Sequence, residues 1–341
     1  MKPLVQVQNL SISYQTQLGK VHSVRNIDFS LQAGRTTALV GESGCGKSVT
    51  CRSLMGLIQH PGQVDPKSSI VFSGQDVTRF TSKQWQSFRG KAVSMIFQDA
   101  SSALNPTMPI GRQIAEGLRN HADCRLTPAQ LRQAVCQMLQ LVGIPDAESC
   151  MKRYPHQLSG GMRQRVMIAA AAITKPQLLI ADEPTTALDV TIQAQILALL
   201  AQLQQQIHMA ILLVTHDLGV VAQMADTIVV MYAGKIVEEG PCTQLFRTPQ
   251  HPYTWALLHA VPRIDQESGS LLSTIEGTLP DAIHPPSGCP FCNRCPWAMN
   301  ICAQQMPPFT QLSPEHRAAC WLCDPRMPAH NRPAFEGGST L

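Results

Sequence analysis

Residues 41–48 carry the sequence GESGCGKS, which matches the phosphate-binding pattern GxxxxGK(S/T). They stand between a short apolar strand, predicted over Thr37–Val40, and a helix, predicted over Ser48–Ile58. Glycines in such a loop let backbone N–H groups curl around a phosphate, and the helix points its positive end at the same charge. A chance glycine turn is the alternative, and the strand and helix on either side argue against it. The sequence therefore predicts a nucleoside-triphosphate site.

The loop pattern assigns tasks to particular side chains. Lys47 is expected to reach the β- and γ-phosphates, and the Ser48 hydroxyl is expected to bind Mg²⁺. Cys45 is interpreted as a tolerated small residue, although modification of its thiol could block nucleotide binding. The predicted nucleotide contacts are Gly41, Ser43, Gly44, Cys45, Gly46, Lys47, Ser48 and Val49.

Two acidic residues and a histidine follow apolar strands further along the chain. Asp182 and Glu183 end the strand pattern Leu178–Ala181, and His216 follows the strand pattern Ile211–Val214. Adjacent acids at a strand end usually form a solvated turn, and a lone histidine there is usually structural; the phosphate loop upstream reverses this preference. Because ligands of α/β sheets bind at the carboxyl ends of strands, His216 is expected beside the phosphates. Asp182 is expected in the Mg²⁺ shell, and Glu183 as the group that polarises the attacking water.

The order of apolar patterns predicts an α/β fold. From Gln164 on, helix and strand patterns alternate, which favours a parallel sheet with helices on its faces. Residues 4–14 and 26–32 alternate apolar and polar side chains, which is typical of exposed antiparallel strands. Residues 100–157 carry helix-like runs broken by prolines, and residues 227–237 are predicted to form a hairpin.

Composition narrows the class of protein and divides the chain. Of the 341 residues 44% are hydrophobic and 15% charged, and a net charge of +4 gives no electrostatic footprint for nucleic acid. No stretch reaches the roughly 18 apolar residues of a membrane span, and no secretory leader is visible, so we expect a cytosolic chain. Prolines become frequent after residue 240. We expect a nucleotide-binding domain over 1–240, a Cys/Pro-rich extension with a helix at Tyr253–Ala260 over 241–323, and a flexible tail over 324–341.

A glycine pair precedes the helix that leads to the Asp182 strand, in the sequence LSGGM at residues 158–162. The chemistry-bearing residues follow in the order Tyr14, phosphate loop, Gln98, Ser159, Gly160, Gly161, Asp182, Glu183, Asp189 and His216. This joint order resembles the ATPases of ABC transporters over about residues 4–240, with Met162 where their signature sequence usually has glutamine. The resemblance implies a P-loop ATPase core of mixed sheet and helices. It adds an antiparallel β subdomain and a helical subdomain at about residues 100–160.

The same resemblance implies roles for single residues. Tyr14, which alone would be taken for a surface strand residue, stacks on adenine, and Gln98 touches Mg²⁺ and the attacking water. His216 contacts the γ-phosphate. The signature residues Ser159, Gly160 and Gly161 cap the ATP of a second subunit, with a helix N-terminus facing its γ-phosphate. Asp189 lies at the seam of that dimer. Hydrolysis therefore requires a second ATPase subunit, with ATP and Mg²⁺ as cofactors and Ser48, Gln98 and Asp182 around the ion.

Further runs narrow the resemblance. The sequences FQD at 97–99, ALNP at 103–106, YPHQ at 154–157 and HPYT at 251–254, with the cysteine-rich tail, resemble ATPase subunits of oligopeptide and dipeptide importers, including related nickel and glutathione systems. The resemblance implies a second, similar ATPase (a heterodimer), two membrane permeases, an extracytoplasmic binding protein, and a place on the cytoplasmic face of the membrane. The alternatives are nickel or glutathione as cargo and a soluble ABC ATPase of translation or DNA repair. A cluster-carrying redox or sensor protein is a third.

Six of the twelve cysteines lie between Cys289 and Cys323. Four interpretations remain open: buried thiols, disulfides (disfavoured in a reducing cytosol), a tetrahedral zinc site and an iron–sulfur cluster. The tail pattern of the resembling family corresponds to Cys289, Cys295, Cys302 and Cys320, and some members carry a [4Fe–4S] cluster there. Cys292 and Cys323 are additional. We therefore expect a [4Fe–4S] cluster, with zinc as the alternative.

Overall fold

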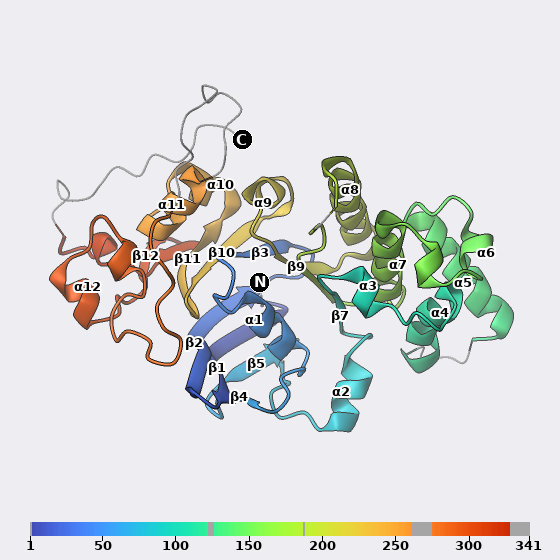
Figure 1. The fold of residues 1–341 in the computed structure, drawn as a ribbon, viewed down its shortest axis with the longest axis horizontal. Helices are drawn as coiled ribbons and strands as arrows, with labels where there is room; N and C mark the ends of the chain where they lie inside the picture. The colour runs from blue at the N-terminus through green and yellow to red at the C-terminus, as the bar shows by residue number, and fades with distance from the viewer. Residues whose placement is uncertain (1, 122–125, 187, 261–274, 328–341) are drawn as a thin grey trace. The chain divides into compact units, whose positions relative to one another are not determined.

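The computed structural model describes residues 2–121, 126–186, 188–260 and 275–327. The chain divides into two compact units, both shown in Figure 1. Unit 1 consists mainly of Arg79–Val214, with the short segment Leu31–Thr36. Unit 2 consists of Pro3–Ser30, Thr37–Thr78 and the residues from Thr215 on. The phosphate loop belongs to unit 2, whereas Asp182 and Glu183 belong to unit 1.

Unit 1 is built on three parallel strands that are buried along their whole length. Ile180 of the middle strand pairs with Met95 on one side and with Leu212 on the other. Burial on both faces explains why these strands are continuous apolar runs in the sequence. The strands are β7 (Val93–Ile96), β8 (Leu178–Asp182) and β9 (Ala210–Val214).

The helices of unit 1 include the predicted helical stretch. In Figure 1 the green helices α4 to α7 gather in one group, and α4 and α5 both contact α7, which also packs on β7. Capping boxes begin two of the unit's helices: Thr127 with Gln130 begins α5, and Thr81 with Gln84 begins α2. The helices are α2 (Ser82–Phe88), α3 (Ala100–Ala103), α4 (Ile110–His121), α5 (Pro128–Leu141), α6 (Ala147–Cys150), the 3-10 turn η1 (Pro155–Gln157), α7 (Gly160–Ala172) and α8 (Val190–Ile207).

Unit 2 contains an antiparallel sheet in the order β2-β1-β5-β6, with β4 also paired to β1. The two predicted strands are present and longer than expected, because β1 runs on to Thr16 and β2 begins at Gly19. The remaining strands of this sheet were missed by the sequence analysis, since they are short and weakly alternating. The strands are β1 (Val5–Thr16), β2 (Gly19–Leu31), β4 (Gly62–Val64), β5 (Ser69–Phe72) and β6 (Gln75–Asp76).

A second set of strands in unit 2 runs in the order β12-β13-β11-β10-β3. The predicted hairpin is confirmed as β10 and β11, with Gly234 at its turn (φ 79°). The helix after the phosphate loop ends at Leu54 rather than Ile58, because Gly56 takes a left-handed conformation (φ 59°). The elements are β3 (Thr36–Val40), β10 (Thr227–Tyr232), β11 (Lys235–Pro241), β12 (Thr310–Ser313), β13 (His316–Ala318), α1 (Lys47–Leu54), α9 (Leu218–Met224), α10 (Cys242–Arg247), α11 (Pro252–His259), η2 (Cys292–Arg294), α12 (Asn300–Gln304) and η3 (Trp321–Cys323).

The cysteine-rich segment is built onto this second set of strands. The hairpin β12–β13 pairs with β11, where Glu238 lies opposite Ala318. Glu238 is fully buried, and its carboxylate contacts His316 Nε2 at 2.8 Å and accepts the His251 N–H at 2.9 Å. One hydrophobic core joins Val40 of β3 and Val230 of β10 to Phe291 and Cys302 of the segment. The segment therefore shares the core of the strands next to the phosphate loop.

The predicted domain bounds stay predictions, and most of the predicted tail, residues 328–341, lies outside the described residues. Among the residues that the structure describes, none belongs to a helix long and apolar enough to cross a bilayer.

Candidate nucleotide-binding site

Gly41 and Gly46 make the tight turns of the phosphate loop. Their φ angles are 150° and 104°, a region that side chains rarely adopt. A Cβ on Gly41 would lie 2.0 Å from the carbonyl oxygen of Met231, and a Cβ on Gly46 would lie 2.4 Å from that of Ser23. The loop therefore needs glycine at both positions for space as well as for conformation.

Lys47, the first residue of α1, forms hydrogen bonds with backbone carbonyl groups at the start of the phosphate loop. Its side chain is 6% exposed, and Nζ donates to the carbonyl oxygens of Gly41 (2.7 Å) and Glu42 (3.0 Å). A phosphate in the loop would offer charged acceptors, which form stronger hydrogen bonds with an ammonium than neutral carbonyls do. The ammonium group of Lys47 thus lies at the phosphate loop itself.

The other predicted nucleotide contacts of the loop differ in exposure. Ser43 and Gly44 are exposed, whereas Ser48 and Val49 are half-buried. Cys45 is fully buried, and burial raises the pKa of its thiol even though Lys47 opposes this effect. The thiol is therefore protonated at neutral pH, in agreement with its interpretation as a tolerated small residue rather than a reactive one.

Two further predicted residues lie in unit 2. Tyr14 is half-buried on β1, and its ring covers Gly62 of β4, where a Cβ would lie 2.6 Å from Tyr14 Cε1. His216 follows β9 in the chain and is exposed.

The structure brings Gln98 and Glu183 of unit 1 together, as the sequence analysis predicts for residues of one site. Glu183 follows β8 in a left-handed conformation (φ 49°), which is uncommon for a residue with a side chain. Its Oε2 accepts hydrogen bonds from Gln98 Nε2 (2.8 Å) and Thr186 Oγ1 (2.9 Å). The carboxylate is therefore held in one orientation. Asp182, the last residue of β8, is 4% exposed.

The signature residues begin helix α7. Ser159 caps the helix by accepting the Met162 N–H at 3.3 Å, so the departure from glutamine leaves this backbone contact in place. Gly160 borders open space, whereas a Cβ on Gly161 would lie 3.2 Å from Ile192 of α8. Asp189 in turn caps α8 by accepting the Ile192 N–H at 2.9 Å. The helix N-terminus at Ser159 is thus exposed, as binding the ATP of a second subunit would require.

Comparisons with known proteins agree with this geometry. Residues 24–186 match the family model described as ABC transporter, and residues 237–302 match the model described as oligopeptide/dipeptide transporter, C-terminal region. The chain is 50% identical over 326 residues to the dipeptide transport ATP-binding protein DppD of Bacillus subtilis, with 96% of each chain covered. The chain belongs to the ATP-binding subunits of oligopeptide and dipeptide ABC transporters. This confirms the predicted family, the predicted fold class and the prediction that the chain is an ATPase.

Other relatives extend the comparison. The ATPase is 45% identical over 318 residues to the oligopeptide transport ATP-binding protein OppD of Salmonella typhimurium, with 93% of each chain covered. Among solved structures, the ATP-binding cassette MJ0796, a dimer bound to ADP and phosphate, matches with a TM-score of 0.63 at 22% identity. That match covers 70% of this chain and 98% of the cassette. At this identity the structural match shows the fold alone.

Two side chains that contact the phosphate loop of the ATPase are not among the predicted site residues. The Tyr253 hydroxyl accepts the Glu42 N–H at 2.8 Å, and Arg294 Nη1 donates to Glu42 Oε2 at 2.8 Å. Both residues follow the predicted boundary at residue 240. The only sequence signal was their place in the HPYT run and in the Arg-Cys pair of the tail, and neither pattern indicates a contact with residue 42.

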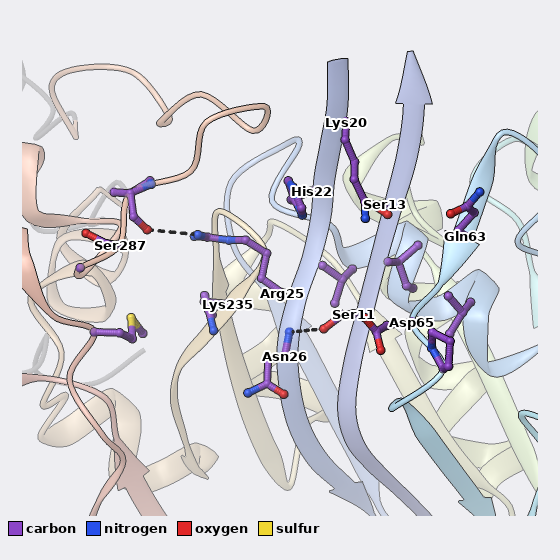
Figure 2. A pocket seen from close by; sticks show the side chains of 17 residues that line it. Ser11, Ser13, Lys20, His22, Arg25, Asn26, Gln63, Asp65, Lys235 and Ser287 are labelled. Carbon is purple, nitrogen blue, oxygen red and sulfur yellow. Dashed lines mark hydrogen bonds between the residues drawn. The ribbon is translucent and has the colours of Figure 1, made fainter. Parts of the chain in front are cut away.

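A cavity of about 430 Å³ lies elsewhere on unit 2, beside β1 and β2. Figure 2 shows Lys20, His22, Arg25 and Lys235 around it. Burial, and then the charges of Lys20 and Arg25, lower the pKa of His22, so this histidine is neutral at pH 7. Arg25 Nε and Nη2 donate to the carbonyl oxygen of Ala233 at 3.1 and 2.9 Å. The cavity thus offers positive charge, and its arginine is already held by backbone carbonyl groups.

A small apolar pocket, here called the thiol pocket, is lined by His251 and by Cys289, Cys292, Cys295, Cys302 and Cys320. The four cysteines predicted from the family pattern thus line one pocket, and the additional Cys292 joins them. Cys323 instead donates to the carbonyl oxygen of Gln250 at 3.6 Å. Burial raises the pKa of Cys289 and of Cys295 to about 12. These thiols are therefore protonated at neutral pH unless a cation binds them.

The expected cluster is not supported by the side-chain positions themselves. Among the described residues, no group of three or more Cys, His, Asp or Glu side chains is arranged to hold a metal ion, and the eleven described cysteines are all free thiols.

We predict that Lys47→Ala weakens ATP binding by about 10- to 100-fold, because it removes a charge-assisted hydrogen bond to the phosphates. Calorimetric titration of the full chain with Mg·ATP measures the change. Lys83→Ala, which removes an exposed lysine of α2, is the matched control and should bind ATP as the wild type does. Equal affinities of Lys47→Ala and the wild type would contradict the assignment.

Proposed function

We propose that this chain is the ATPase that energises the import of dipeptides or oligopeptides through membrane permeases. The observation that carries this proposal is the 50% identity, over 96% of both chains, to a protein named for dipeptide transport. The match of residues 237–302 to the C-terminal region of oligopeptide and dipeptide transporters supports it independently of the ATPase core.

The predicted site residues take the following roles in this proposal. The phosphate loop and Lys47 bind the β- and γ-phosphates, and Tyr14 stacks on adenine. Ser48, Gln98 and Asp182 surround Mg²⁺. Glu183, oriented by Gln98 and Thr186, takes a proton from the attacking water. The water oxygen bonds to the γ-phosphorus while the bond from that phosphorus to the bridging oxygen breaks, and ADP leaves. His216 stabilises the γ-phosphate. Ser159, Gly160 and Gly161 cap the ATP bound by a second subunit, and Asp189 lies at the seam between the two subunits.

The proposal includes partners. The exposed N-terminus of α7 provides N–H groups and a positive dipole end for the ATP of a second subunit. From the resemblance to the importer family, we propose that this subunit is a second, similar ATPase, so that the pair is a heterodimer. Two permeases and an extracytoplasmic binding protein complete the transporter, and the chain then lies on the cytoplasmic face of the membrane. ATP favours the closed ATPase dimer over the open one, and this difference in binding free energy drives the permeases.

The cargo is tested by uptake into cells that lack this chain. We predict that uptake of a radiolabelled dipeptide is lost in such cells and returns with the wild-type gene, whereas uptake of radioactive nickel and of glutathione does not change. Because the binding protein and the permeases select the cargo, the three uptake rates are compared in cells that express the ATPase at one level. Loss of nickel or glutathione uptake with unchanged peptide uptake would assign the related cargo instead.

The role of Glu183 is tested in the assembled transporter. We predict that Glu183→Gln lowers the rate of ATP hydrolysis by at least about 100-fold, because the amide cannot accept the proton of the attacking water. The affinity for ATP should change by less than about threefold, since the side chain keeps its size and can still pair with Gln98. Glu116→Gln, at an exposed position on α4, is the control. Unchanged hydrolysis by Glu183→Gln would refute the role.

The thiol pocket fits a thiolate-bound group in one specific respect. His251 Nδ1 accepts the Tyr253 N–H at 3.0 Å, so the ring proton lies on Nε2. His251 is 1% exposed, and within the described residues its Nε2 has no hydrogen-bond partner. A buried donor without an acceptor costs about 1–3 kcal/mol, and a thiolate or sulfide in the pocket would supply the acceptor. We therefore propose Cys289, Cys295, Cys302 and Cys320 as ligands of a [4Fe–4S] cluster, which would stabilise the segment, with zinc as the alternative.

This proposal predicts that the full chain, purified without oxygen, contains iron and acid-labile sulfide in equal amounts and absorbs visible light. Cys302→Ser should lower both contents, because it removes a thiolate ligand. Cys150→Ser, a buried cysteine of α6 outside the pocket, should leave both contents unchanged. Zinc without iron would show that the pocket holds the alternative ion. The absence of any metal would show that the six cysteines are structural thiols.

A further inference from the structure

Arg294 connects the cysteine-rich segment to the phosphate loop. It ends the 3-10 turn η2, and its side chain is 6% exposed. Nη1 donates to Glu42 Oε2 at 2.8 Å and to the Tyr232 hydroxyl at 3.1 Å. Nε and Nη2 donate to the backbone carbonyl oxygens of Glu276 (2.8 Å) and Ile275 (2.7 Å). Hydrogen bonds on all three nitrogens hold the guanidinium in one place.

Packed aromatic rings support this arginine. The guanidinium lies 5.7 Å from the ring centre of Tyr232 and 6.0 Å from that of Phe291. Tyr232, Phe291 and Tyr253 contact one another, with ring centres 4.6 to 5.3 Å apart. Aromatic side chains of this size lose little conformational freedom when they pack, so the cluster is a rigid support.

Glu42 is held at three points. Its carboxylate contacts Arg294, its N–H donates to the Tyr253 hydroxyl (2.8 Å), and its carbonyl oxygen accepts from Lys47 Nζ (3.0 Å). Two of these three partners belong to the chain beyond residue 240. Because Glu42 is the second residue of the phosphate loop, the chain beyond residue 240 fixes both the backbone and the charge of the loop, through Tyr253 and Arg294 respectively.

The charge of Glu42 matters for ATP. The triphosphate brings several negative charges to the loop, and a carboxylate on the same loop repels them unless a cation neutralises it. We propose that Arg294 is a positioning residue for ATP: it neutralises Glu42, turns the carboxylate to the cysteine-rich segment, and so makes the affinity of the phosphate loop depend on that segment. This inference rests on the proposed binding of ATP by residues 41–48.

The electrostatic role predicts a pattern that a merely structural contact does not. Arg294→Gln leaves an unneutralised carboxylate and should weaken Mg·ATP binding about tenfold, which corresponds to ~1.4 kcal/mol. Glu42→Gln removes the repelling charge and should therefore bind ATP clearly more tightly than Arg294→Gln does. The double variant Arg294→Gln/Glu42→Gln should recover to within about threefold, because the charge that Arg294 neutralises is absent. If the contact were only structural, Glu42→Gln would be as harmful as Arg294→Gln.

Calorimetric titration of the full chain with Mg·ATP tests this pattern, with a thermal melt of every variant. Raising the salt concentration from about 50 to 500 mM should shrink the difference between Arg294→Gln and the wild type, because salt screens the repulsion. Arg326→Gln is the matched control: Arg326 follows the cysteine-rich segment in the chain and pairs with Asp324 on the surface. It should bind ATP as the wild type does.

The outcomes separate this inference from the proposed function. A wild-type chain that binds no ATP refutes both. A wild-type chain that binds ATP, with Arg294→Gln binding equally well, overturns only the role of Arg294, as does a double variant that stays as weak as Arg294→Gln. If Arg294→Gln folds poorly, Arg294→Lys decides: the lysine keeps the charge, so affinity within about threefold supports the inference and a tenfold loss with an unchanged melt overturns it.

Discussion

The phosphate loop depends on two places where one backbone runs directly against another. Gly41 lies on the carbonyl group of Met231 in β10, and Gly46 lies on that of Ser23 in β2, without room for a Cβ. The Gly234 N–H adds a third contact by donating to the Cys45 carbonyl oxygen at 2.9 Å. The loop therefore takes its shape from β2 and β10, whose backbone it contacts.

The same strands explain why the cysteine-rich segment is more than an appendage. Strand β10 carries Met231, which contacts the loop, and Tyr232, which contacts Arg294 and Phe291. Strand β11 pairs with β10 on one side and with β13 of the segment on the other. The turn that holds Arg294 also carries Cys292 and is followed by Cys295, both in the lining of the thiol pocket. The cysteines of the thiol pocket and the phosphate loop are thus both positioned by strands β10 and β11.

Sequence reasoning succeeded where the signal is local. The phosphate loop, β3, β8 and β9 are short runs whose residues and neighbours carry the pattern. The resemblance to the importer family pointed to four cysteines, and these four are among the five that line the thiol pocket. It failed for contacts across long stretches of chain. Glu42 and Arg294 are 252 positions apart. Neither the sequence around Glu42 nor the sequence around Arg294 indicates that the two side chains are in contact. Strands β12 and β13 are too short and polar for their alternation to stand out, since β13 forms by pairing with β11, and β12 by pairing with β13, rather than by propensity.

The claim that this chain hydrolyses ATP to drive peptide import is tested most directly in proteoliposomes. The chain is reconstituted with the proposed permeases and second ATPase subunit, and ATP hydrolysis is measured with and without the peptide-loaded binding protein. The account predicts that hydrolysis rises severalfold only when permeases and loaded binding protein are both present. A rate that is indifferent to both, or that rises instead with ribosomes or DNA, would contradict it.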